Sequence, residues 1–135
     1  MNSFRNNRHV GVVEHAIRWL AEEENRHPDY IMLLQPTSPL RTASDINRAI
    51  EIAQENDSIA VVSVSAAKQH PYLSKRVLED GTLADYVPNN VTDRRRQVLP
   101  PAYALNGSIY LNRREFLLNH RRFEPQGTHA YIMPA

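Results

Sequence analysis

The 135-residue sequence predicts an α/β fold built around an open, mostly parallel sheet. Two apolar runs, at 30–35 and 59–64, show no polar–apolar alternation, which is typical of strands buried on both faces. Between them, residues 43–56 carry apolar side chains at helical spacing. A strand, a helix and a strand joined by short connectors predict a βαβ unit with a right-handed crossover.

Further elements are predicted on both sides of this unit. Residues 10–26 repeat apolar side chains at helical spacing, and this helix ends before "HPD" because the residue preceding a proline disfavours helical geometry. Thr42 is predicted to cap the helix at 43–56, with Asp45 completing a capping box. The elements that follow the βαβ unit are a strand at 107–112, a helix at 113–120 and a strand at 129–134. Among the large apolar residues, we expect Trp19, Met32 and Tyr110 in the core.

The composition is that of a globular protein rather than a disordered chain, with 41% hydrophobic and 23% charged residues. No apolar run approaches the roughly 20 residues that cross a bilayer, and the N-terminus lacks the apolar core of a signal peptide. We therefore expect a cytoplasmic protein that does not enter a membrane. The absence of cysteine excludes disulfides, thiolate metal sites and a cysteine nucleophile.

Basic residues gather in the last third of the chain. Residues 91–135 hold seven Lys or Arg against three Asp or Glu. An RNA-binding surface is usually more basic and interleaved with stacking aromatics, and its affinity falls steeply with salt. Two or three arginines placed for a small anion, or a solvated surface, both fit better, so we expect no nucleic-acid partner.

Residues 66–105 show no helical period. They hold several prolines and a "DG" turn at Asp80–Gly81. We expect short strands and loops here, forming an excursion from the sheet that can contact a partner subunit.

The stretch "LLQPTSPLR" places polar residues at the end of a buried strand, the edge at which open α/β sheets bind ligands. The amide of Gln35 can donate and accept, and two prolines stiffen the loop. Arg41 directly precedes a helix start, where unpaired N–H groups favour an anion. A rigid connector with Arg41 as surface charge explains the pattern equally well.

A second polar group lies in "RRRQVLPPAYALNGSIYL". The guanidinium of Arg96 can bind a carboxylate or a phosphate in two parallel hydrogen bonds, although at least one of these arginines is expected to be solvated surface. Asn106–Gly107 can form a tight turn before the strand. The six histidines show no metal-ligand spacing, and no nucleophile elbow, Walker loop or dinucleotide motif occurs.

Taken together, "LLQPTSPLRTASDI", "VVSV", "HPY", "RRQVLP" and "NGSIYL" resemble the N-acylneuraminate cytidylyltransferases, or CMP-sialic acid synthetases. This family includes the legionaminate and pseudaminate cytidylyltransferases. The resemblance runs from about residue 10 to 134 and implies a three-layer, Rossmann-like nucleotide-diphospho-sugar transferase fold.

The resemblance also implies a reaction and residue roles. CMP passes from CTP to a nine-carbon acidic sugar, releasing pyrophosphate, with Mg²⁺ as cofactor and a homodimer as the working form. By resemblance, Gln35 contacts the sugar, and Asn106 and Gly107 form the edge of the site. Arg96 then serves as the catalytic residue that handles the charge, and Lys75 reaches the sugar carboxylate.

Three departures from the family pattern qualify this reading. No Gly/Ser/Lys-rich nucleotide loop precedes Val10, and the paired metal-binding aspartates expected after the last strand do not appear before Ala135. Ala104 stands where many members have an arginine. The sequence therefore predicts a fragment without its first strand and without metal ligands, which keeps the sugar side of the site and is inactive alone. A non-catalytic module that binds an acidic sugar or assembles with another chain is the alternative.

Overall fold

The structure, a computed structural model, describes residues 2–36, 41–95 and 98–134. It divides into two compact units. Unit 1 comprises Met1–Val64 and Leu105–Met133, and unit 2 comprises Ser65–Ala104 and Pro134–Ala135. Each unit is described separately below.

Unit 1 contains the sheet and all the α-helices found among the described residues. In chain order its elements are α1 (Asn2–Glu24), β1 (Tyr30–Leu33), α2 (Ala43–Asn56), β2 (Ala60–Ala66), β5 (Tyr103–Arg113), α3 (Arg114–His120) and β6 (His129–Ile132). Strands β2 and β5 each extend two residues beyond the unit's boundary. The order of strands in the sheet is β1-β5-β2-β6.

The sheet is mixed, which corrects the prediction of a mostly parallel one. Strand β6 runs parallel to β2, whereas β5 runs antiparallel to β1, with Tyr30 opposite Arg113 and Leu33 opposite Tyr110. The predicted strand–helix–strand unit is present as β1, α2 and β2, but β5 lies between its two strands. A continuous apolar run indicates burial on both faces and carries no information about the direction of the neighbouring strand.

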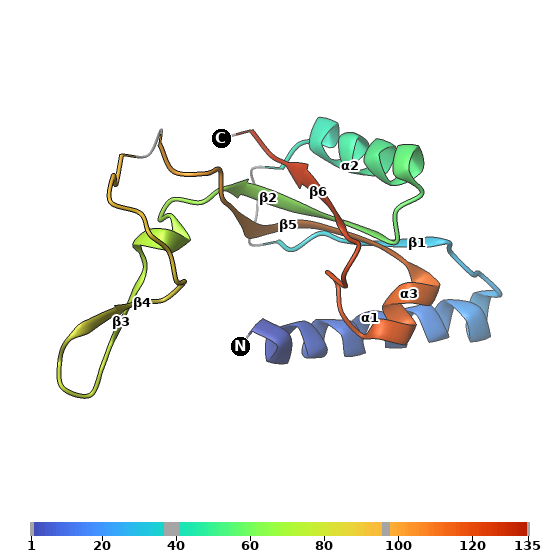
Figure 1. The fold of residues 1–135 in the computed structure, drawn as a ribbon. Helices are drawn as coiled ribbons and strands as arrows, with labels where there is room; N and C mark the ends of the chain where they lie inside the picture. The colour runs from blue at the N-terminus through green and yellow to red at the C-terminus, as the bar shows by residue number, and fades with distance from the viewer. Residues whose placement is uncertain (1, 37–40, 96–97, 135) are drawn as a thin grey trace. The chain divides into compact units, whose positions relative to one another are not determined.

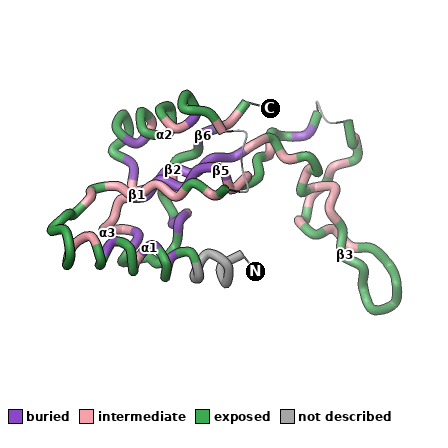
Figure 2. The backbone as a smooth tube through the Cα atoms, turned by 180° about the vertical axis from the view of Figure 1, so that it is seen from behind, coloured by how far each residue is buried: buried purple, intermediate pink, exposed green. Residues whose placement is uncertain are grey.

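Helices cover both faces of the sheet, with α2 on one side and α1 and α3 on the other (Figure 1). Accordingly there are two apolar clusters. One joins α1 and α3 to the sheet through Val10, Val13, Ile17, Val62, Val64, Tyr110, Leu117 and Phe123. The other joins α2 to the opposite face through Ala49, Ala53, Val61, Ile109, Leu111 and Tyr131. The central strands β2 and β5 carry the longest buried stretches of the tube in Figure 2.

The helix boundaries confirm some predictions and correct others. The capping box of α2 is present, with Thr42 at the N-cap and Asp45 three residues on. Helix α1 begins eight residues before its predicted start, since residues 2–9 hold no proline or glycine to stop it. Trp19 is 48% exposed on α1, so the prediction that it belongs to the core is wrong, while Tyr110 is buried as expected.

Unit 2 is built from a short 3₁₀ helix, η1 (Pro71–Leu73), and an antiparallel hairpin of β3 (Lys75–Val77) and β4 (Leu83–Asp85). The predicted turn at Asp80–Gly81 connects the two strands, and Gly81 adopts a positive φ of 86°. The two arms of unit 2 are joined where the amide of Ala67 donates to the carbonyl of Ala102 at 2.9 Å. None of the helices within the described ranges is long and apolar enough to cross a bilayer.

Candidate functional site

Four of the six predicted site residues lie in unit 1, at the ends of strands. Gln35 follows β1 and Arg41 precedes α2, while Asn106 and Gly107 belong to β5. All four are partly buried. The structure thus brings the polar end of "LLQPTSPLR" and the "NG" turn to one part of the molecule, although Thr37, Ser38 and Pro39 lie outside the described residues.

The closest approach between the two segments joins Gln35 and Gly107. A Cβ atom added at Gly107 would lie 3.3 Å from Oε1 of Gln35, and Gly107 adopts a φ of +74°. Glycine is required here both for the left-handed backbone and for the close approach of the glutamine. The amide of Gln35 therefore lies directly beside the backbone of β5.

Arg41 closes the polar segment on itself. Its Nη1 donates to the carbonyl oxygen of Gln35 at 2.6 Å. A charged donor at this distance makes a strong hydrogen bond. Arg41 is therefore more than surface charge, because it holds the chain just after β1 against the start of α2.

Asn106 is held by a residue that the sequence reasoning missed. Its Oδ1 accepts from the hydroxyl of Ser63 at 2.6 Å and from the amide of Ser108 at 3.0 Å. The Ser63 hydroxyl in turn accepts from the amide of Ile109 at 2.8 Å. Ser63 is buried in β2, and a single serine inside the apolar run "VVSV" was the signal that could have identified it.

A second missed residue, Tyr131 on β6, reaches the start of α2. Its hydroxyl donates to Oδ1 of Asp45 at 2.6 Å, and both side chains are buried. This hydrogen bond, together with one from the backbone of Thr42, lowers the pKa of Asp45. The same bond to Asp45, with burial, raises the pKa of Tyr131 to about 12.

The remaining two predicted residues are not placed with these four. Lys75 belongs to unit 2, where it forms an ion pair with Asp85 across the β3–β4 hairpin. Both side chains line a polar cavity of about 420 Å³ that also includes Asn90, Thr92 and Arg94. Arg96, the predicted catalytic residue, lies outside the described residues.

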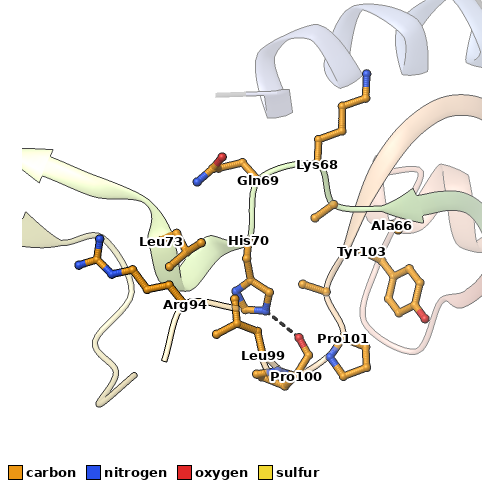
Figure 3. A pocket seen from close by; sticks show the side chains of 12 residues that line it. Ala66, Lys68, Gln69, His70, Leu73, Arg94, Leu99, Pro100, Pro101 and Tyr103 are labelled. Atoms are coloured by element: carbon orange, nitrogen blue, oxygen red, sulfur yellow. Dashed lines mark hydrogen bonds between the residues drawn. The ribbon is translucent and has the colours of Figure 1, made fainter. Parts of the chain in front are cut away.

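A second cavity of unit 2, of about 380 Å³, is lined by the chain around His70 and by Leu99, Pro100, Pro101 and Tyr103. Figure 3 shows the ring of His70 reaching the carbonyl oxygen of Pro100, at 2.7 Å from Nε2. Because the amide of Tyr72 donates to Nδ1 at 3.1 Å, Nδ1 must be unprotonated and Nε2 carries the hydrogen. The two prolines predicted to stiffen this approach are thus fixed from the opposite arm.

The chemistry of the described side chains does not favour a metal centre. Among the residues that the structure describes, no group of three or more His, Asp or Glu side chains is placed to hold a cation. The buried carboxylate of Asp45 is already bonded to Thr42 and Tyr131. The described residues therefore do not fit the Mg²⁺ site that the resemblance implies.

Comparison with known proteins gives a consistent set of relatives. No family model matches the chain. The chain is 37% identical over 102 residues to an N-acylneuraminate cytidylyltransferase of Streptococcus agalactiae, which covers 76% of the chain and 24% of that protein. It is 31% identical over 106 residues to the CMP-N,N'-diacetyllegionaminic acid synthase of Legionella pneumophila, covering 78% of the chain and 44% of that protein. It is also 30% identical over 105 residues, again 78% of the chain and 44% of the relative, to the post-translational flagellin modification protein B of Campylobacter coli. The chain thus spans between about a quarter and less than a half of the relatives it matches.

Proposed function

Because this chain belongs to the N-acylneuraminate cytidylyltransferase family over about three quarters of its length, we propose that it is part of a CMP-transferring enzyme. The proposed reaction moves CMP from CTP to a nine-carbon acidic sugar and releases pyrophosphate. A cytoplasmic location follows from this proposal, since CTP is a cytoplasmic nucleotide. Mg²⁺ is the proposed cofactor of the complete enzyme, with ligands outside the described part of this chain.

Within this reaction, the proposed task of unit 1 is recognition of the sugar. The amide of Gln35 can both donate to and accept from hydroxyl groups, and Arg41 holds the backbone from which it projects. Nucleotidyl transfer depends mainly on positioning and charge, so a fixed amide at the sugar has a direct part in it. The observation that carries the proposal is the approach of Gln35 Oε1 to Gly107 in a chain of this family.

Calorimetric titration of the 135-residue chain with N-acetylneuraminic acid tests this role. We expect binding with a Kd of about 1 mM or tighter, the upper range of enzyme substrates. Gln35→Ala should weaken binding roughly tenfold, the effect of one lost hydrogen bond of about 1.4 kcal/mol. Gln54→Ala, at an exposed position of α2, is the matched control. Equal affinities for these two variants would reject a role for Gln35.

The chain by itself is proposed to bind the sugar without turning over CTP, because it spans less than half of each relative. A pyrophosphate-release assay with CTP, sugar and Mg²⁺ tests this directly. Turnover near ~1 s⁻¹ or faster, the lower end of typical enzymes, would contradict it. The second candidate function, a non-catalytic sugar-binding or assembly module, requires that the chain fold alone and bind the sugar while no longer reading frame supplies a nucleotide loop.

A homodimer through unit 2 is the proposed assembly, with exposed apolar side chains as its support. Val77 is 73% exposed and Leu83 is 65% exposed, and they lie opposite each other in the hairpin. Tyr86, just beyond β4, is 65% exposed. An isolated two-stranded hairpin is marginal in water, so covering this face by a second copy would stabilise it.

Light scattering after size-exclusion chromatography tests the dimer. The wild-type chain should have the mass of two copies, and the double variant Val77→Lys with Leu83→Lys should have the mass of one. Val12→Lys, which places the same charge at an exposed valine of α1, should leave the mass unchanged. A monomeric wild type would refute this assembly.

A further inference from the structure

A buried side-chain pair lies beneath the candidate site and is not part of it. Tyr131 on β6 donates from its hydroxyl to Oδ1 of Asp45, at 2.6 Å. Asp45 is 8% exposed and Tyr131 is 9% exposed. A buried carboxylate must keep all its acceptors satisfied, so this contact fixes both elements firmly.

The bond from Tyr131 is not needed to cap the helix. The capping box of α2 uses the other carboxylate oxygen, Oδ2 of Asp45, which accepts from the amide of Thr42 at 2.8 Å and from its hydroxyl at 3.1 Å. The hydroxyl of Thr42 also accepts from the amide of Asp45. A helix start can be capped by such a box alone, in contact with water. Here the remaining oxygen ties the start of α2 to a strand 86 residues away in the sequence.

The start of α2 is continuous with the polar segment after β1. Arg41 precedes the N-cap residue Thr42, and its guanidinium donates to the carbonyl oxygen of Gln35 at 2.6 Å. A movement of the helix start would therefore shift the guanidinium and the residue that it holds. The chain of contacts runs from Tyr131 through Asp45 and Thr42 to Arg41 and Gln35.

Strand β6 also leads to the other half of the site. Met133 lies two residues after Tyr131, and both pack in the cluster beneath α2. The side-chain amide of Asn106 donates to the sulfur of Met133 at 3.3 Å. The same short segment thus contacts the start of α2 and the residue before Gly107.

We propose that Tyr131 is a positioning residue, which acts through Asp45 to set the place of Gln35 relative to Gly107. This proposal rests on the sugar-binding role of Gln35 for its effect on affinity. The placement itself does not depend on that role and is measured without ligand.

The test compares Tyr131→Phe with Tyr110→Phe in the full chain. Both tyrosines are buried in the sheet, but Tyr110 packs in the cluster on the opposite face, toward α1 and α3. We expect Tyr131→Phe to shift the NMR signals of the Gln35 side-chain amide and the Gly107 backbone amide in the ligand-free chain. It should also weaken N-acetylneuraminic acid binding by about 3- to 30-fold, the usual range for coupling through a packed network. Tyr110→Phe should do neither.

A merely structural role for Tyr131 predicts a different result. The folded Tyr131→Phe chain would then melt at a lower temperature but keep the Gln35 and Gly107 signals and the sugar affinity of the wild type, which would overturn the proposal. If Tyr131→Phe does not fold, Asp45→Asn replaces it, because one amide oxygen cannot serve both Tyr131 and Thr42. If the wild type binds no sugar, the proposed function fails, while the ligand-free signals still decide the positioning role.

Discussion

In unit 1, polar side chains around the candidate site are partly or fully buried and bonded to one another, whereas the β3–β4 hairpin of unit 2 exposes apolar side chains. Ser63, Asn106, Asp45 and Tyr131 satisfy one another inside the sheet domain. Val77 and Leu83 have no comparable cover within their own hairpin. The difference indicates that unit 1 is built to hold a fixed arrangement, and that unit 2 is built to be covered by something else.

The largest effect should come from removing the buried carboxylate of unit 1. Asp45→Ala abolishes the capping box and leaves the hydroxyl of Tyr131 buried without its acceptor. We expect a loss of about 2–4 kcal/mol in the free energy of unfolding, measured in urea, from the cap and the unpaired hydroxyl together. A loss below about 1 kcal/mol would show that this network is not what fixes unit 1.

Gly107→Ala should have the next largest effect. Its φ of +74° disfavours any L side chain by roughly 1–2 kcal/mol, and the added Cβ also presses on Gln35. We expect a loss of that size in urea together with weaker sugar binding. Gly11→Ala is the opposite control, because it lies in α1 with nothing within 4 Å and should stabilise the chain by roughly 0.5–1 kcal/mol.

In unit 2, the corresponding experiment is His70→Ala. It removes the bonds to Pro100 and from Tyr72, each worth about 1 kcal/mol net. We expect faster hydrogen exchange at the amides of Ala67 and Tyr72, with little change in the core amides of β2. Equal loss of protection in both units would show that they unfold as one body and would remove the contrast between them.

At neutral pH the smallest effect is that of the Tyr131 phenol, which becomes visible in alkali. Because the folded pKa of Tyr131 is raised to about 12, its contribution is complete below the ordinary tyrosine pKa of about 10 and is lost as pH rises through 12. Absorbance at ~295 nm should show one tyrosine titrating above the exposed ones. Asp45→Asn should remove this late phase, and its persistence would contradict the assigned bond.

Local features of this fold could be predicted from the sequence, and long-range ones could not. The capping box of Thr42 and Asp45 and the turn at Gly81 depend on residues within a few positions of each other, and both were predicted. The insertion of β5 between β1 and β2 depends on pairing across the chain, which periodicity does not encode.

The site shows the same division. The polar types at Gln35, Asn106 and Gly107 were visible as motifs, but the partners that hold them were not. Ser63 lies 43 residues from Asn106, and Tyr131 lies 86 from Asp45, so no local pattern connects them. Trp19 was misplaced for a related reason, since an aromatic residue near an apolar helical stripe can face the core or the solvent.

The most direct test of sugar recognition is an NMR titration of the ¹⁵N-labelled chain with N-acetylneuraminic acid. The side-chain amide of Gln35 and the backbone amide of Gly107 should shift together and saturate with one Kd, while Gln54 on the exposed face of α2 stays in place. No shift at either site residue up to concentrations well above ~1 mM, or shifts confined to unit 2, would contradict the proposed sugar site in unit 1.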